Sequence, residues 1–171
     1  MTRVPLLILS GTVGAGKSSV GAAISGLLKA REVPHAFVDL DALAVSWPEH
    51  GRFNEELALR NLASVWENFR SAGAQRLVIA YVVESRGDLR RYEEAVPGAE
   101  ITVCRLVASQ ATREARLRKR ETGSGLAWHL NRTAELEAIL QQAAVEDFCV
   151  ENDGRPLEAV ALEVLQKAGW L

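Results

Sequence analysis

The chain has 171 residues, of which 48% are hydrophobic, and it carries 20 lysines and arginines against 22 aspartates and glutamates. This length suits one domain with a sizeable buried core, and no shift in composition divides residues 1–171 into two parts. The near balance of charge argues against nucleic acid or an anionic membrane as a partner, and no apolar stretch approaches the roughly 20 residues that cross a bilayer. We therefore expect a small-molecule partner and a cytoplasmic location.

Short apolar segments alternate with amphipathic ones along the whole chain. The apolar segments lack polar alternation, which is typical of parallel strands buried on both faces. They span residues 4–9, 35–40, 77–83, 101–107 and 148–151. Helical spacing of apolar residues predicts helices over residues 18–30, 54–72, 89–95, 110–121, 130–143 and 156–168. This alternation predicts a layered α/β sheet with right-handed crossover connections.

The first predicted strand leads into a complete G-x-x-x-x-G-K-[ST] motif, Gly11-Thr12-Val13-Gly14-Ala15-Gly16-Lys17-Ser18. Glycines let the backbone N–H groups of such a loop face inward, and the next helix begins with its positive dipole end toward the same concavity. We expect the loop and Ser19 to bind the phosphates of ATP. Lys17 would reach the β- and γ-phosphates, and the Ser18 hydroxyl would ligate Mg²⁺. The alternative is a glycine-rich turn with only a structural role.

The second predicted strand ends in two carboxylates, Asp39 and Asp41. The carboxyl ends of parallel strands form the ligand-binding edge of an open α/β sheet, and side chains two apart on a strand share a face. We expect Asp39 to arrange Mg²⁺ together with Ser18, and Asp41 to accept the proton of an attacking hydroxyl. The alternative is that one of the two aspartates only caps the next helix.

Candidates for binding the acceptor follow the second and third strands. A guanidinium holds a carboxylate or phosphate through two parallel hydrogen bonds, so Arg52 and Arg60 are candidates for an anionic acceptor, and Trp47 for stacking. Each has a plain alternative as a surface or domain-edge residue. After the third strand, Glu84 is a candidate for contacting the acceptor or a Mg²⁺-bound water. Its alternative is an ion pair with Arg86.

Three arginines on the fourth helix, Arg113, Arg116 and Arg120, recur at spacings of three and four, which aligns them on one face. If this face overhangs the phosphate loop, its guanidinium groups offset the charge of the transferred phosphoryl group and stack on adenine. Residues 123–125, Gly-Ser-Gly, would then be the hinge of a lid over residues 113–130. The alternative is a solvated helix face.

Three further residues have less specific surroundings. Cys104 and Cys149 each lie in a predicted strand, which favours reduced, buried thiols over a disulfide. His129 has no evident partner in the sequence, and we expect it to have a structural role.

Together these motifs resemble those of the small phosphate-loop kinases, among them adenylylsulfate kinase, gluconate kinase, shikimate kinase and chloramphenicol phosphotransferase. The resemblance covers nearly the whole chain. Its most specific parts are the loop at 11–18, Asp39-Leu40-Asp41, and Arg116-Leu117-x-x-Arg120, which is similar to the start of the lid in these kinases. It implies one domain with the three-layer P-loop NTPase fold, a five-stranded parallel sheet in the order 2-3-1-4-5 with helices on both faces.

The resemblance also implies residue roles. It assigns Arg116 to the adenine ring, Arg120 to the phosphates, and Asn152 and Arg155 to the segment that borders adenine. The motifs that identify the acceptor in individual families are missing: no Gly-Gly-Gly follows the third strand as in shikimate kinase, and no proline-rich segment follows Ser85 as in adenylylsulfate kinase. The acceptor therefore stays open.

We expect an ATP-dependent phosphotransferase that moves the γ-phosphoryl group of Mg-ATP to a hydroxyl of a small molecule. Lys17, Asp39, Asp41 and Arg120 are the expected catalytic residues. One alternative is a nucleotide-binding NTPase or switch that acts on a partner protein, with Glu84 positioning water. Another is a kinase of nucleotides or nucleic acids, although nucleic acid requires a basic groove that the charge balance does not favour. A monomer and a homodimer both remain open.

Overall fold

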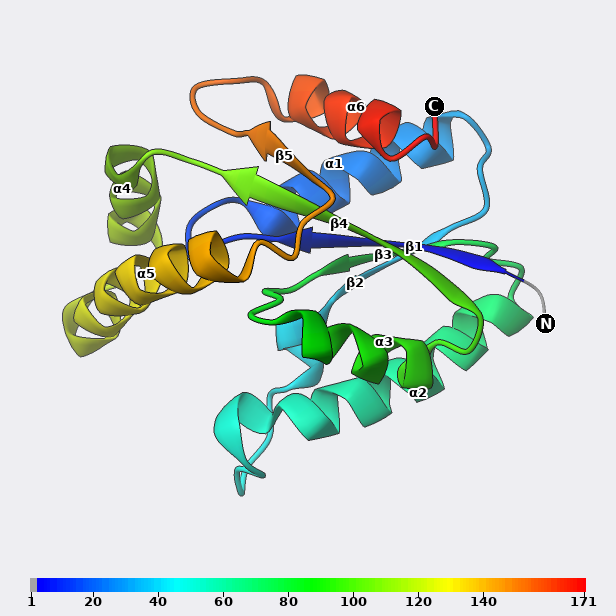
Figure 1. Cartoon of the computed structure of the whole chain (residues 1–171), viewed down its shortest axis with the longest axis horizontal. Helices are drawn as coiled ribbons and strands as arrows, with labels where there is room; N and C mark the ends of the chain where they lie inside the picture. The colour runs from blue at the N-terminus through cyan, green and yellow to red at the C-terminus, as the bar shows by residue number, and fades with distance from the viewer. Residues whose placement is uncertain (1–2) are drawn as a thin grey trace.

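A five-stranded parallel sheet forms the centre of the computed structural model, which describes residues 3–171 (Figure 1). Every neighbouring pair of strands is parallel, and the order across the sheet is β2-β3-β1-β4-β5. The strands are β1 (Val4–Ser10), β2 (Ala36–Asp39), β3 (Leu77–Ala80), β4 (Ala99–Val107) and β5 (Phe148–Glu151). The predicted strand order is confirmed.

Helices cover both faces of the sheet (Figure 1). They are α1 (Lys17–Ala30), α2 (Glu55–Ser71), α3 (Leu89–Ala95), α4 (Gln110–Arg120), α5 (Gly123–Ala143) and α6 (Leu157–Lys167). Helices α1 and α6 pack on one face and α2 and α3 on the other, whereas α4 and α5 lie beside the carboxyl ends of the strands. Within residues 3–171, no helix is long and apolar enough to span a membrane.

Strand β1 is buried on both faces because its apolar side chains point alternately to the two layers. Leu6 and Ile8 join the core under α2 and α3, and Leu7 and Leu9 join the core under α1 and α6. All four side chains are inaccessible to solvent. Burying each one stabilises the fold by about 1.5–3 kcal/mol, so the position of β1 is firmly fixed.

Strand β2 ends one residue earlier than expected, and this changes the position of Asp41. The carboxylate of Asp39 accepts a hydrogen bond from the backbone N–H of Asp41 at 3.2 Å and so begins a 3₁₀ turn, η1 (Leu40–Leu43). Asp41 therefore lies on this turn and not on the strand, and the expectation that both aspartates share one strand face was wrong. The Asp41 N–H is therefore bonded to a side chain and not to the neighbouring strand, and β2 ends here.

Strand β3 also ends early, at Ala80, although the chain continues along β1 to residue 83. The backbone N–H of Tyr81 still donates to the Leu9 carbonyl at 3.1 Å. The N–H of Val83 donates to the Ser10 hydroxyl at 3.1 Å instead of to a backbone carbonyl. This hydroxyl holds the extended segment that leads to Glu84.

Helix α5 begins seven residues before the predicted start at residue 130, because residues 123–125 form its first turn. The helices α4 and α5 therefore meet at Glu121 and Thr122, which have extended backbone angles. The structure contradicts the expected Gly-Ser-Gly hinge at 123–125. Residues 123–125 are exposed and extend a helix whose buried residues begin at Arg132, so the packing of the rest of α5 compensates for the low helix propensity of the two glycines.

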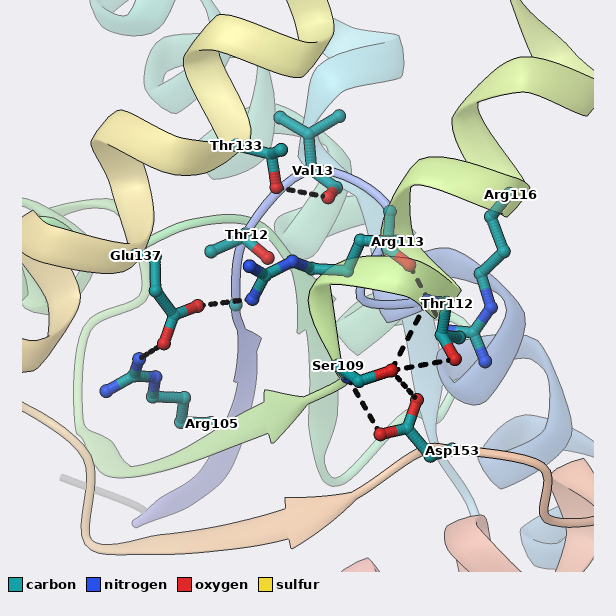
Figure 2. Close-up of polar contacts among 12 residues, drawn as sticks. Thr12, Val13, Arg105, Ser109, Thr112, Arg113, Arg116, Thr133, Glu137 and Asp153 are labelled. Atoms are coloured by element: carbon teal, nitrogen blue, oxygen red, sulfur yellow. Dashed lines mark hydrogen bonds and ion pairs between the residues drawn. The ribbon is translucent and has the colours of Figure 1, made fainter.

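Buried ion pairs attach α4 and α5 to the sheet (Figure 2). Glu137 on α5 bridges Arg105 of β4 at 2.8 Å and Arg113 of α4 at 2.5 Å. Both arginine side chains are only 9% exposed and have little access to water, so Glu137 bridges two buried guanidinium groups, while Glu146, 3.5 Å from Arg105, supplies the second negative charge. This arrangement contradicts the expected single basic stripe, because Arg113 points into the protein and not toward solvent.

The Glu137 bridge predicts a large loss of stability on substitution. Glu137→Gln removes the charge that two buried guanidinium groups share, and we expect the free energy of unfolding to fall by about 2–3 kcal/mol in urea denaturation. The matched control is Glu94→Gln, which breaks an ion pair with Arg90 whose side chains are 64% and 83% exposed and should change stability little. Equal effects of the two substitutions would contradict the role of the bridge.

The two cysteines differ in exposure. Cys104 is buried in β4, and burial raises the pKa of its thiol to about 12. Cys149 is exposed at the edge strand β5, so the expectation of a buried thiol was wrong there. An edge strand leaves one side of its residues without a covering neighbour.

This difference predicts one reactive thiol in the folded protein. Because the thiolate is the reactive form, Ellman's reagent at pH 8 should titrate one thiol per native chain and two after denaturation. Cys149→Ser should remove the native reaction and Cys104→Ser should leave it unchanged. The reverse pattern would show that the assignment of buried and exposed thiols is wrong.

Candidate nucleotide and acceptor site

A cavity of about 1080 Å³ opens at the carboxyl ends of the strands. It lies between the phosphate loop, the helices α4 and α5, and the segments that follow β2, β3 and β5. Most of the site residues predicted from the sequence line it: Val13, Gly14, Gly16, Lys17, Ser18, Ser19, Asp39, Asp41, Arg52, Glu84, Arg116, Arg120, Asn152 and Arg155. Gly11, Thr12 and Ala15 are buried in the loop beneath this surface.

Glycine is required at two positions of the loop. Gly11 and Gly16 have φ angles of 145° and 95°, which residues with a side chain rarely adopt. A Cβ atom would lie 2.7 Å from the Leu106 carbonyl oxygen at Gly11, and 2.5 Å from Nδ2 of Asn152 at Gly16. Helix α1 begins directly after Gly16 without a side-chain cap, so its first N–H groups face the cavity and are suited to an anion.

Lys17 lies at the floor of the cavity. Its ammonium group donates to the carbonyl oxygens of Gly11 and Thr12 at 2.9 and 3.0 Å. Burial lowers the pKa of Lys17 to about 8, and the carboxylates of Asp41 and Asp39 limit the fall. An anion bound beside this group would favour its charged form and raise the pKa again.

The two aspartates after β2 have different surroundings. Asp39 accepts a hydrogen bond from the Ser18 hydroxyl at 2.5 Å with one carboxylate oxygen, and caps η1 with the other. The capping role weighed from the sequence is therefore real for Asp39, in addition to its contact with Ser18. Burial raises the pKa of Asp41, while Lys17 opposes the rise and the charge of Asp39 adds to it.

Ser18 and Asp39 suit a magnesium ion. They bring a hydroxyl oxygen and a carboxylate oxygen into contact, and Mg²⁺ is commonly held by one or two protein oxygens together with phosphate oxygens and water. Among residues 3–171, no group of three or more His, Cys, Asp or Glu side chains is placed to form an all-protein metal site.

Arg116 and Arg120 both line the cavity but have different partners. Arg116 donates to the carbonyl oxygens of Gly14 at 3.1 Å and Asn152 at 2.7 Å, which ties the phosphate loop to the segment after β5. Arg120 is largely exposed and pairs with Glu121 at 3.0 Å. Arg120 is therefore the more mobile cation of the two.

Further contacts fix the helices beside the phosphate loop (Figure 2). The Thr133 hydroxyl of α5 donates to the Val13 carbonyl at 2.8 Å. Ser109, the N-cap of α4, accepts from the Thr112 N–H and its own N–H donates to Asp153 at 2.8 Å. Helix α5 thus contacts the loop directly, and α4 is anchored to the segment after β5.

Sequence reasoning missed Arg132, which lies on α5. Its side chain is 6% exposed and forms ion pairs with Glu84 and, at 2.8 Å, with Glu135. Glu84 therefore pairs with Arg132 and not with Arg86, the alternative weighed from the sequence. Trp128, Arg132 and Leu136 recur at a spacing of four and all line the cavity, a signal that a helix predicted from residue 123 would have revealed.

The aromatic side chains that line the cavity are not the one predicted from the sequence, Trp47, but three others. Phe53 and Trp128 are about half exposed and meet edge to face, with ring centroids 6.1 Å apart. His129 lines the cavity too, with Nε2 3.4 Å from the Glu121 carboxylate, a partner that was not evident from the sequence. The buried ring of Tyr81 completes this side.

Two predicted acceptor residues, Trp47 and Arg60, lie outside the cavity. Trp47 is 87% exposed, and Arg60 is exposed on α2. The exposure of Trp47 follows from the conformation of the loop before α2. In this loop the buried Asn54 side chain donates to the Ala44 carbonyl at 2.8 Å and accepts from the His50 N–H at 2.5 Å. These bonds close the loop on itself and leave Trp47 at its tip.

No family model and no curated protein sequence matches the chain. Solved structures do match it over almost its full length. The tunicamycin resistance protein of Deinococcus radiodurans is 15% identical with a TM-score of 0.65, and covers 99% of this chain and 98% of its own. A gluconokinase of Sinorhizobium meliloti is 23% identical, with a TM-score of 0.60 and coverage of 98% and 93%.

The APS kinase of Mycobacterium tuberculosis, solved in complex with AMPPNP and APS, is 18% identical with a TM-score of 0.58. It covers 97% of this chain and 98% of its own. The shared sheet order and helix layers agree with the resemblance in the sequence motifs. The chain therefore has the fold of the small P-loop kinases.

Proposed function

We propose that the protein is an ATP-dependent phosphotransferase of the cytoplasm that uses Mg²⁺ and moves the γ-phosphoryl group of ATP to a hydroxyl of a small molecule. The observation that carries this proposal is the position of Asp41, a partly buried carboxylate beside Lys17 in the cavity that the phosphate loop lines. A volume of about 1080 Å³ exceeds what one small ligand requires, roughly 300–1,000 Å³, which supports a site for two substrates.

The phosphate loop would bind the triphosphate. Backbone N–H groups at the start of α1 and the Lys17 ammonium group would hold the β- and γ-phosphates. Ser18 and Asp39 would hold Mg²⁺, which would supply positive charge to offset that of the phosphates. Since Glu84 is bonded to Arg132, we assign the metal to Ser18 and Asp39 alone.

Asp41 would act as the base. The acceptor hydroxyl oxygen forms a bond to the γ-phosphorus, its proton passes to the Asp41 carboxylate, and the bond to the β–γ bridging oxygen breaks to release ADP. The raised pKa of Asp41 makes this carboxylate a better proton acceptor than an exposed one.

The two arginines of α4 that line the cavity would contact different parts of the nucleotide. The Arg120 side chain is exposed and would reach the γ-phosphoryl group during its transfer, where its guanidinium group would offset the developing negative charge. Arg116, Asn152 and Arg155, which the family resemblance relates to adenine, all line the cavity, and Arg116 donates to the Asn152 carbonyl. We assign these three residues to binding the adenine ring.

The assignment of Asp41 predicts a separation of binding from turnover. Asp41→Asn should lower the rate of phosphoryl transfer about 10²- to 10⁴-fold, because the acceptor loses its base, while Mg-ATP affinity measured by calorimetry changes little. Lys17→Ala should abolish ATP binding. Transfer is detected as an added phosphate, by mass, on members of a pool of hydroxylated metabolites.

The control is Glu93→Gln, an exposed change on α3 that should leave both quantities unaltered. ATP consumption that ignores every metabolite and persists in Asp41→Asn would instead support an NTPase or switch that acts on a partner protein. Transfer only to oligonucleotides would support a nucleic-acid kinase.

The pKa of Lys17 predicts a pH dependence of ATP binding. Free Lys17, with a pKa of about 8, loses its proton above that pH, whereas bound phosphate stabilises the protonated form. Binding should therefore take up at most about three quarters of a proton at pH 8.5 and approach one proton at higher pH, and affinity should fall by up to tenfold per pH unit well above pH 8. Calorimetry in buffers of different ionisation enthalpy measures this uptake.

Lys17→Arg is the matched variant, because a guanidinium group stays protonated throughout this range. It should retain part of the affinity and lose the proton uptake that titration of Lys17 causes. Equal uptake in both proteins would assign the titration to another group.

A further inference from the structure

The acceptor side of the cavity contains two arginines, and their partners decide what they can bind. We define the acceptor side by the six lining residues Arg52, Phe53, Tyr81, Glu84, Trp128 and Arg132. In this part of a phosphotransferase, an unpaired guanidinium is suited to a carboxylate, sulfate or phosphate group of the acceptor. The availability of Arg52 and Arg132 therefore bears directly on the class of acceptor.

Arg132 is already neutralised by the protein. One nitrogen of its guanidinium group bonds to Glu84, and the other to Glu135 at 2.8 Å. The group also lies over the Phe53 ring, 5.6 Å from the centroid. With its side chain 6% exposed, Arg132 has carboxylate partners on both nitrogens and little water to exchange for an acceptor anion.

Arg52 is a weaker candidate than a buried arginine for binding an acceptor anion. Its guanidinium group lies over the same Phe53 ring at 5.0 Å from the centroid, and the residue is exposed at the mouth of the cavity. An exposed arginine that contacts an anion gains little free energy, because water screens the pair. Arg52 therefore does not replace a buried clamp.

Three carboxylates, those of Glu55, Asp41 and Glu84, also lie on or near this side, and the cations Lys17 and Arg120 act on Asp41. Burial raises the pKa of the Tyr81 hydroxyl, the carboxylates of Glu55, Asp41 and Glu84 raise it further, and Arg91 opposes the rise. Glu55 is paired with Arg91 at 2.7 Å. An acceptor anion on this side would meet a buried guanidinium that carboxylates already balance and, beside it, the exposed Arg52, so the desolvation cost of the anion would be poorly compensated.

We infer that Glu84 determines acceptor specificity by neutralising Arg132, so that the site takes a hydroxyl compound without a carboxylate, sulfate or phosphate group. This inference rests on the proposed phosphotransferase function and names its class of acceptor. It replaces the anionic acceptor expected from Arg52 and Arg60. Specificity of this kind comes from repulsion of the wrong ligand as much as from attraction of the right one.

The test uses a pool of hydroxylated metabolites that anion exchange divides into a retained, anionic fraction and an unretained fraction. The full-length protein is incubated with each fraction and Mg-ATP carrying a labelled γ-phosphate. We expect label in the unretained fraction to exceed that in the anionic fraction at least tenfold. In Glu84→Gln, Arg132 loses one of its charged partners, and label in the anionic fraction should rise at least tenfold.

Two variants separate this role from a general effect on the fold. Glu135→Gln removes the exposed partner of Arg132 but keeps Glu84, so the anionic fraction should stay unlabelled. The double variant Glu84→Gln, Arg132→Gln lacks the freed guanidinium group, so the gain should disappear. The melting temperature and ATP affinity of each variant show whether it is folded; if Glu84→Gln does not fold, the wild-type comparison of fractions decides the question.

Each outcome has one meaning. Wild-type label mainly in the anionic fraction overturns the inference while the phosphotransferase function stands. A folded Glu84→Gln variant without gain overturns the role of Glu84. Label in neither fraction, with Mg-ATP still bound in calorimetry, overturns the phosphotransferase function and the inference with it.

Discussion

The burial of β1 on both faces is the constraint from which the site follows. Its alternate side chains enter two separate apolar cores, so the strand cannot shift or rotate without exposing one of them. The phosphate loop leaves the end of this strand, and α1 starts where the loop closes at Gly16. The segment after β3, the strand beside β1, and the end of β2, the strand beyond β3, bring Glu84 and Asp39 to the same edge of the sheet.

A second layer of contacts holds α4 and α5 over that edge. Glu137 joins both helices to β4 through two buried guanidinium groups, and the Thr133 hydroxyl contacts the loop itself. These bonds place Arg116 against the loop carbonyls while Arg120, one turn further on, stays exposed. Arginines of one helix thus acquire different roles because their burial differs: a buried one stabilises the fold, and the others face the cavity.

The same principle applies to the acceptor side. Arg132 and Glu84 are chemically suited to contact substrate, but each is the main buried partner of the other. The pair balances a positive charge of the cavity and leaves Arg52, aromatic rings and carboxylates on the side that we propose for the acceptor. Acceptor recognition is therefore proposed to depend on which charges the protein has already neutralised.

The sequence by itself determined the phosphate loop, the two aspartates after β2 and, through the family resemblance, the sheet order, because these depend on residues close together in the chain or on an uninterrupted apolar run. Only the tertiary structure decided that Arg113 points inward, that Glu84 pairs with Arg132, and that residues 123–125 are helical. The partners in those ion pairs are 24 and 48 residues apart, and residues 123–125 are the exposed first turn of a helix whose buried part begins at Arg132. Local pattern carries no information about pairings at such separations, since they depend on how whole helices pack.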